Sequence, residues 1–342
     1  MFLKKISSFD ISIVLVYIFQ AFLYLIFLST SISLTSFNFI IFLVLCIFLG
    51  IGIVMLFCYL FSLSNKSIFY NIKSKFIIFI LISIVFLFAC FSIKMISNYI
   101  SFIYLKDMNI FIIMGSLILS IFFLIKKDIC SFFRCSTLIF YFYLLLEILS
   151  FILLCFYFKV HNILPVTFDI NNILDHSYLY LVFIVLPILF LLMVPRYLIK
   201  DNKVFSKKIF ITYIIISIII SIKSIMSISI LGYKSIDIYK YIDVVMYKNI
   251  NLFTFIERIE WLLCFNSITN MFFLISLSMF YIKEGLNYIL PIKKKSYIYP
   301  LLIFMFVLIF GYLFDFSLVI ITWIMILFFF IHLFYALFKL LK

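Results

Sequence analysis

The sequence predicts an all-α polytopic membrane protein in which ten transmembrane helices form a 5+5 inverted repeat. Hydrophobic residues make up 68% of the 342 residues and charged residues 12%, and the mean hydropathy is +1.36. Because soluble domains are about 45–50% apolar and about 25% charged, this composition excludes soluble globular, disordered and fibrous proteins. The apolar runs are continuous and do not alternate with polar residues, so they favour helices over a β-barrel.

Ten apolar stretches are each close to the roughly 20 residues that a helix needs to cross a bilayer. The first has no small-residue cleavage pattern after it, which predicts a retained helix and not a signal peptide. The fourth and sixth are short, and the sixth contains Pro187. No stretch between them is long enough for a soluble domain, so residues 1–342 are predicted to form a single transmembrane domain. The expected spans are residues 9–30, 37–61, 76–97, 109–125, 136–158, 178–195, 209–231, 257–281, 297–314 and 316–339.

The distribution of lysine and arginine predicts the orientation of these spans. If the amino terminus is cytoplasmic, 19 of the 27 basic residues fall in cytoplasmic segments and five in outer loops, as the positive-inside rule requires. An even number of spans then places both termini in the cytoplasm. The net charge of +14 is attributed to loops that face anionic lipid. No basic, aromatic-interleaved soluble domain indicates a nucleic-acid partner.

The ten spans divide into two sets of five, residues 1–160 and 178–342, which must enter the membrane from opposite sides because five is odd. Transporters built from inverted repeats have this arrangement and bind their ligand near the bilayer midplane. The outer segment 232–256 differs from the other loops. Its apolar residues recur at helical spacing from Ile236 to Met246, with charged residues between them. It is predicted to be an amphipathic helix on the outer surface, with a plain solvated loop as the alternative.

Two ionisable residues fall in the middle of predicted spans, where a charge costs roughly 2.5–3.5 kcal/mol to insert. At 1.5 Å per residue, Glu147 lies about 16 Å along the fifth span and Lys223 about 21 Å along the seventh. Both are therefore near the midplane, and we predict that they pair or line one aqueous path. Such a path would carry ions or protons. The alternative is a purely structural buried pair, whose attraction seldom offsets its desolvation.

Polar residues also share helical faces in the first and eighth spans. Tyr17, Gln20 and Tyr24 form a stripe in the first span. We expect Tyr17 and Gln20 to bind the ligand, although Gln20 is equally suited to a hydrogen bond between helices. Asn266 and Asn270 share a face of the eighth span and are expected to bridge to a neighbouring helix.

A second candidate ligand-binding stripe lies in the third span, where Ser83, Cys90, Lys94 and Ser97 align at the 3.6-residue period. Lys94 is expected to attract a carboxylate of the ligand. The alternative is that Lys94 extends to the outer headgroups, since it is only a few residues from the end of the span. Tyr180, in the sixth span, completes the predicted ligand-binding set together with Ser83 and Cys90.

A charged group marks the outer start of the eighth span. Glu257 and Glu260 are placed where acidic side chains interact favourably with a helix amino terminus, and Arg258 can bond to either of them. We expect these residues to anchor the surface helix or to serve in gating or subunit contact.

No constellation predicts catalysis, a cofactor or a metal site. The seven cysteines lack zinc-site spacing, and no nucleotide-binding or hydrolase motif occurs. The histidines and aspartates of the outer loop 159–177 have no spacing specific for a metal. We therefore predict a protein that is not an enzyme.

The segment around the start of the eighth span resembles a known family. Phe255-Ile256-Glu257-Arg258-Ile259-Glu260, followed by a span ending Ile275-Ser276-Leu277-Ser278-Met279-Phe280-Tyr281, is similar to the signature region of the endospore germination permeases, the B subunits of germinant receptors. Lys5-Ile6-Ser7-Ser8-Phe9 resembles the family's entry into its first span. The outer loop from Asn162-Ile163-Leu164-Pro165-Val166 to Ile173-Leu174 resembles its fifth-to-sixth connection.

The resemblance implies a LeuT-like fold of the amino acid–polyamine–organocation superfamily. It also implies a sensor for a small nutrient such as an amino acid, in a complex with an A subunit and a lipoprotein C subunit in the spore inner membrane. Ligand binding would trigger ion release and germination. A stand-alone amino-acid or cation symporter of the same fold is the first alternative, and a membrane polysaccharide polymerase is the second. Such polymerases need large outer loops with arginine-rich patches, which this sequence lacks.

Overall fold

The protein is an all-helical membrane protein, as the composition predicted. Apart from turns and a single parallel bridge between Ile6 and Ile199, the residues that the computed structural model describes are mainly helical. The described residues are 6–29, 44, 47–55, 58, 75–126, 129–163, 187, 190, 199–200, 202–232, 241–250, 259–289, 298–314 and 323. The named helices are α1 (Ser8–Ser29), α4 (Lys75–Ile103), α5 (Ile110–Lys126), α6 (Ile129–Cys155), the 3₁₀ helix η1 (Val160–Ile163), α9 (Asn202–Leu231), α11 (Ile242–Lys248), α12 (Ile259–Leu263), α13 (Phe265–Ile289) and α14 (Ile298–Leu313).

Four described segments are long and apolar enough to cross a membrane: Ile78–Ile103, Ile129–Cys155, Phe205–Leu231 and Ile259–Ile289. Three shorter apolar helices occupy Ser8–Phe22, Ile110–Lys126 and Ile303–Leu313. These seven segments overlap the first, third, fourth, fifth, seventh, eighth and ninth expected spans. Most of the second, sixth and tenth spans lies outside the described residues, so the count of ten and the inverted repeat stay predictions.

Residues at the helix ends explain where α1 begins and where α9 ends. At the start of α1 the Asp10 backbone N–H donates to Ser7 Oγ at 3.1 Å, and the Ser7 backbone N–H donates to Asp10 Oδ2 at 3.2 Å. This reciprocal pair is a capping box, which satisfies amides that the first turn leaves free. Helix α9 ends at Leu231 and is followed by Gly232, whose φ of 79° suits the left-handed residue that follows a helix.

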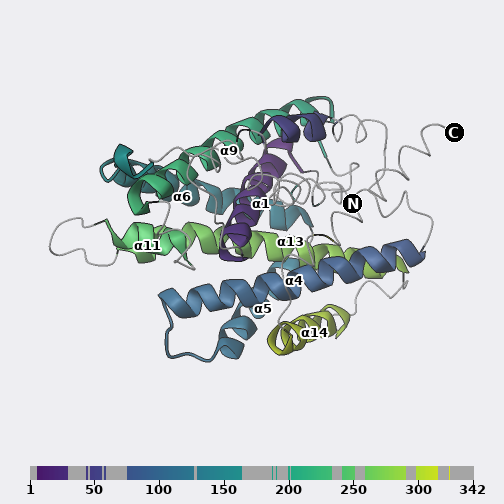
Figure 1. The fold of residues 1–342 in the computed structure, drawn as a ribbon. Helices are drawn as coiled ribbons and strands as arrows, with labels where there is room; N and C mark the ends of the chain where they lie inside the picture. Colours follow the sequence, from purple (N-terminus) through teal and green to yellow (C-terminus); the bar gives the residue numbers. More distant parts are fainter. Residues whose placement is uncertain are drawn as a thin grey trace.

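Helix α13 lies in the middle of the bundle, between α4 and α1, and α1 also packs against α9 and α6 (Figure 1). Of the most apolar window of each segment, 72% is buried for Ile259–Ile289 but only 28% for Ile129–Cys155. Aromatic rings fill the centre: Tyr17 of α1 stacks on Phe273 of α13 with centroids 4.5 Å apart, and Phe22 stacks on Phe88 of α4 at 5.3 Å. The core therefore holds α1 against α4 and α13.

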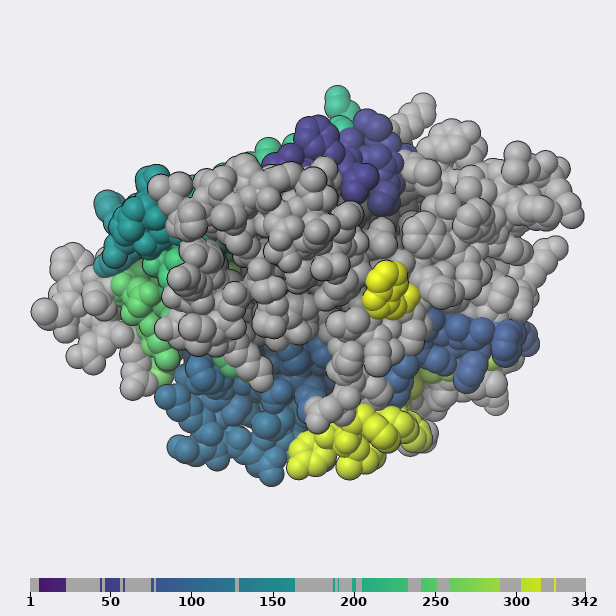
Figure 2. Space-filling view, viewed as in Figure 1, coloured from purple at the N-terminus to yellow at the C-terminus, as the bar shows by residue number. Residues whose placement is uncertain are grey.

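Two lysines connect helix ends on one side of the bundle, where α5 and α14 lie against α4 (Figures 1 and 2). Lys94 of α4 donates to the backbone carbonyls of Tyr312 and Phe314 at the end of α14, both at 3.4 Å. Lys283 of α13 donates to the carbonyl of Ile125 at the end of α5, at 2.9 Å. A cation at a helix carboxyl terminus satisfies free carbonyls and complements the negative end of the helix dipole.

Gly311 provides a test of the packing of α14. A Cβ atom at this position would lie 3.0 Å from Met114 Cε and 3.1 Å from the backbone oxygen of Cys90. We expect Gly311→Ala to lower the free energy of unfolding by about 1–3 kcal/mol, because the added methyl group overpacks the contact with α4 and α5. Thermal unfolding of the detergent-solubilised protein measures this change.

Gly115→Ala is the matched control, since among the described residues its Cβ atom would meet only Leu308 Cδ1, at the ordinary contact distance of 3.7 Å. This variant should unfold at the wild-type temperature or slightly above it. Equal destabilisation by both substitutions would contradict the close approach at Gly311.

Candidate functional site

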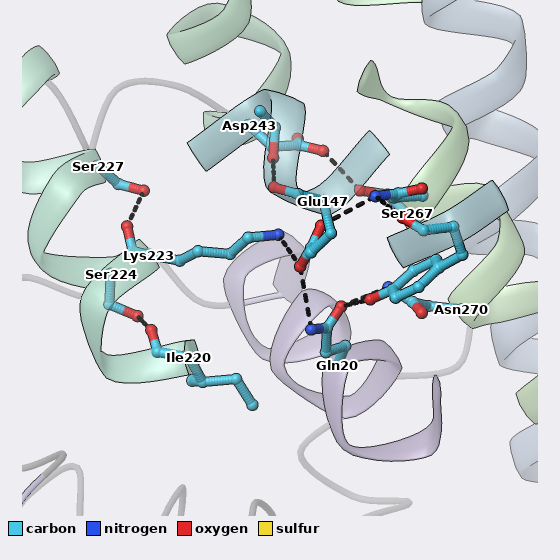
Figure 3. A network of polar contacts seen from close by, with 12 residues as sticks. Gln20, Glu147, Ile220, Lys223, Ser224, Ser227, Asp243, Ser267 and Asn270 are labelled. Carbon is cyan, nitrogen blue, oxygen red and sulfur yellow. Dashed lines mark hydrogen bonds and ion pairs between the residues drawn. The ribbon is translucent and has the colours of Figure 1, made fainter. Parts of the chain in front are cut away.

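The centre of the candidate site is an ion pair between Glu147 of α6 and Lys223 of α9 (Figure 3). The exposed fraction is 13% for the Glu147 side chain and 21% for the Lys223 side chain, so both charges are largely removed from solvent. The sequence predicted that these residues pair or line one path, and the structure brings them into direct contact. An isolated charge in such surroundings is far more costly than a paired one.

Amide side chains from two other helices complete the coordination of the Glu147 carboxylate. Gln20 of α1 donates from Nε2 to Glu147 Oε1 at 3.1 Å, and Asn266 of α13 donates from Nδ2 to Glu147 Oε2 at 2.9 Å. Both carboxylate oxygens are therefore bonded, and four helices meet at one carboxylate. Hydrogen bonds to an ionised acceptor are about twice as strong as those between neutral groups.

A second layer of hydrogen bonds surrounds Gln20. Its Oε1 atom accepts a short hydrogen bond from the Tyr143 hydroxyl and another from Asn270 Nδ2 at 3.0 Å. Tyr143 and Glu147 are four residues apart on α6, and Asn266 and Asn270 are four apart on α13, so each pair shares a helical face. The site thus forms where polar residues at helical spacing on α6 and α13 face Gln20.

Two amide oxygens of the site have no hydrogen-bond donor in the part of the chain that the structure describes. They are Asn266 Oδ1 and Asn270 Oδ1, two of four buried side-chain polar atoms of this kind. Asn266 is 4% exposed and Asn270 5%, so bulk solvent does not reach either residue freely. A buried acceptor left unpaired costs about 1–3 kcal/mol, which makes these oxygens the least satisfied part of the site.

Helix α11 links the site to the predicted outer segment. Asp243 of α11 accepts hydrogen bonds on Oδ2 from the hydroxyls of Tyr99 at 2.6 Å and Ser267 at 2.9 Å. Ser267 is the residue after Asn266, so α11 is bonded to α4 and α13 directly beside the Glu147 cluster. Met246 Sδ, also on α11, lies 3.5 Å from Ser227 Oγ of α9. The described part of segment 232–256 is therefore a short helix in contact with several apolar helices.

Tyr247 of α11 lies near the same carboxylate. Burial raises the pKa of Tyr247 well above its ordinary value, and the negative charges of Glu147 and Asp243 act in the same direction, while a hydrogen bond with Ser150 lowers it. The phenol therefore stays protonated across the physiological range. Ser150 itself donates to the backbone carbonyl of Glu147 at 2.8 Å.

The structure distributes the predicted ligand-binding residues over two regions. Tyr17 and Gln20 lie in the central cluster, where the Tyr17 hydroxyl donates to the Ser136 carbonyl at 3.2 Å. Lys94 instead contacts the end of α14. Cys90 is buried in the core close to Gly311 of α14, and Ser83 donates to the Phe79 carbonyl of its own helix at 3.0 Å. Ligand binding by these residues stays a prediction.

The remaining predicted residues belong to the sixth and eighth spans. Tyr180, Glu257 and Arg258 lie outside the described residues. Glu260 is 7% exposed in the first turn of α12, the end of a helix that favours an acidic side chain. Its role in anchoring, gating or subunit contact stays a prediction. Among the residues that the structure describes, no group of three or more metal-ligating side chains is close enough together to hold a metal.

The sequence placed Asn266 and Asn270 on one face of the eighth span, but neither was among the predicted ligand-binding or ion-path residues. Tyr143, four residues before Glu147, was likewise outside the predicted site residues. The helical spacing of these residues was a usable signal, because each recurs four residues from another polar group. The contacts of Asp243 had no comparable signal, since alternating charges on a short segment equally indicate a solvated surface.

A double-mutant cycle tests the central ion pair. Glu147→Gln leaves the Lys223 ammonium without its counter-charge, and Lys223→Met does the same to the carboxylate. Each single variant should lose about 3 kcal/mol of unfolding free energy, whereas the double variant should lose much less, because neither charge then remains unpaired. Thermal or denaturant unfolding of the detergent-solubilised proteins gives the coupling. Additive losses would show that the two charges do not interact.

Substitution of Lys94 tests whether its contact with the end of α14 stabilises the protein, as the structure indicates, or whether the residue serves the ligand. Lys94→Met should lower the free energy of unfolding by about 1 kcal/mol, because the carbonyls at the end of α14 lose their donor. Thermal unfolding of the detergent-solubilised protein measures this change. Unchanged stability would contradict this role of the contact with α14 and leave the predicted attraction of a ligand carboxylate as the role of Lys94.

One comparison with known proteins assigns the chain to a family. The family model described as "Spore germination protein" matches residues 76–317, more than two thirds of the sequence. The matched region includes Glu147, Lys223, Asn266 and Asn270, while Gln20 lies before it. No curated protein is similar enough to be matched with the chain. The family is of the permease or receptor type, and its match confirms the resemblance found from residues 255–281. The chain is therefore a multi-pass membrane protein of the spore germination permease family.

Proposed function

We propose that the chain is the B subunit of a spore germinant receptor, which senses a small nutrient of the amino-acid class and triggers ion release. The family assignment supports a role in germination. The observation that carries the proposal further is the partly buried Glu147–Lys223 pair, with amides of α1 and α13 bonded to the same carboxylate. Charged residues inside membrane helices commonly mark substrate or ion pathways.

The proposed fold is the ten-span, LeuT-like inverted repeat with both termini in the cytoplasm. The nutrient would bind among the first, third, sixth and eighth spans. In this arrangement α1, α4 and α13 would form three of the four sides of the nutrient-binding site. Helices α1 and α13 are bonded to each other there through Gln20 and Asn270. The proposed location is the spore inner membrane, and the proposed partners are the A and C subunits of the receptor.

Signalling would follow from the shared carboxylate. Because α1, α6, α9 and α13 all bond to Glu147 or to Gln20, displacement of one helix forces the others to exchange hydrogen-bond partners. A nutrient that binds one arrangement of the helices more tightly than another shifts the populations of the two arrangements. The size of the shift is set by the difference between its affinities for them. The segment 236–260, held through Asp243, would transmit the change to partner subunits or open a path for ions past Glu147 and Lys223.

The functional test uses spores. Spores that lack the protein should lose germination with at least one member of a panel of amino acids, sugars and salts. Spores that carry Glu147→Gln should release ions at least tenfold more slowly with that same nutrient, because the carboxylate that joins the helices has lost its charge. Release of potassium and dipicolinic acid into the medium measures both effects.

Ser276→Ala is the matched control for this experiment, since the Ser276 hydroxyl bonds within α13 to the Phe272 carbonyl at 2.7 Å. It should germinate as wild type does. Normal germination of the deletion spores with every nutrient would contradict the receptor, and unchanged ion release in Glu147→Gln would remove Glu147 from the path. Nutrient uptake by the purified chain in vesicles, without partners, would indicate a stand-alone symporter instead.

A further inference from the structure

The two unpaired amide oxygens of α13 lie side by side along the helix and away from the charge pair. Asn266 Oδ1 and Asn270 Oδ1 accept no hydrogen bond within the described chain, and both residues are more than nine-tenths buried. A spacing of four residues puts them on one helical face. Figure 3 shows the Asn270 amide with its nitrogen toward Gln20 and its oxygen turned away.

The orientation of both amides is imposed by Glu147. If the Asn266 amide were flipped, its oxygen would face Glu147 Oε2, which its nitrogen now contacts at 2.9 Å. Gln20 is fixed in the same way, since its nitrogen donates to Glu147 Oε1. Gln20 Oε1 consequently faces Asn270 and requires a donor from it, which Asn270 Nδ2 provides at 3.0 Å. An acceptor cannot bond to an acceptor, so the charge on Glu147 turns both asparagine oxygens outward.

The two outward oxygens are buried and have no hydrogen-bond donor among the described residues, and a bound molecule can supply these donors. The charge at the site limits what this molecule can be. Glu147 and Lys223 neutralise each other in direct contact, so a lone cation bound at the asparagine oxygens would add an uncompensated charge in a buried position. A molecule of zero net charge that presents N–H or O–H donors avoids this cost and still satisfies both oxygens.

We propose that Asn266 and Asn270 form a binding subsite for a net-uncharged small molecule that offers two hydrogen-bond donors. The donors are either the ammonium group of a zwitterionic amino acid or a pair of hydroxyl groups of a polyol. The subsite discriminates against metal cations and simple ammonium ions. That this molecule is the germination nutrient rests on the proposed function, whereas its binding to the purified chain does not.

The test measures binding to the full chain purified in detergent. Radiolabelled L-alanine and D-glucose represent the two sources of donors, and sodium and methylammonium represent cations. One of the first two should bind wild type, and Asn270→Leu should weaken that binding at least tenfold, since it removes the amide oxygen. Asn270→Ser is the second variant, because it keeps a hydroxyl near Gln20 and still lacks this oxygen. It should show the same loss with near-wild-type unfolding.

Thr269→Val is the matched control on the same helix, since the Thr269 hydroxyl bonds internally to the Phe265 carbonyl at 2.9 Å. It should bind the probe as wild type does. The proposal is overturned if neither L-alanine nor D-glucose binds wild type, if the Asn270 variants bind equally well, or if the cations bind with the same dependence on Asn270. If the purified chain binds the probe but spores that lack the protein germinate normally, the receptor function is overturned and the proposed subsite is still supported.

Discussion

The negative charge of Glu147 is the constraint on which the middle of this protein depends. A carboxylate in a bundle this apolar has to be matched by a cation and by donors, and it obtains them from Lys223, Gln20 and Asn266. Each of these lies on a different helix, so a single charge fixes the relative position of α1, α6, α9 and α13. It also fixes which end of each amide points inward, and therefore which atoms face outward.

Much of this arrangement could be predicted from the sequence, for a physical reason. A charge in the middle of an apolar run is so unfavourable that its partner must be another charge at the same height, and Lys223 was the candidate at that height. Gln20 was recognised as part of a polar stripe with Tyr17 and Tyr24 on an apolar helix, suited to bind a ligand or to bond to another helix. The helices themselves follow from composition, since a backbone in lipid must bond within its own segment.

Other contacts depended on the packing of helices, which helical periodicity does not reveal. Lys94 was expected to meet a ligand or the headgroups because its distance along α4 allowed both, but its neighbour α14 offered free carbonyls. Asp243 was one charge among several on a short segment, and only the folded chain brings Tyr99 and Ser267 to it. Angles and registers between helices arise from the fit of side chains, so sequence spacing within one helix cannot supply them.

The lysine contacts at the ends of α5 and α14 have a mechanical consequence. Lys94 joins α4 to α14, Lys283 joins α13 to α5, and Gly311 lets α14 approach α4 and α5 closely. These contacts connect the four helices, so that they resist sliding past one another and form one rigid unit. Helix α1 meets that unit through stacked aromatic rings and through the polar cluster, and in the polar cluster hydrogen bonds can be exchanged without opening a cavity. Relative motion in this molecule should therefore concentrate along the seam beside Gln20 and Lys223.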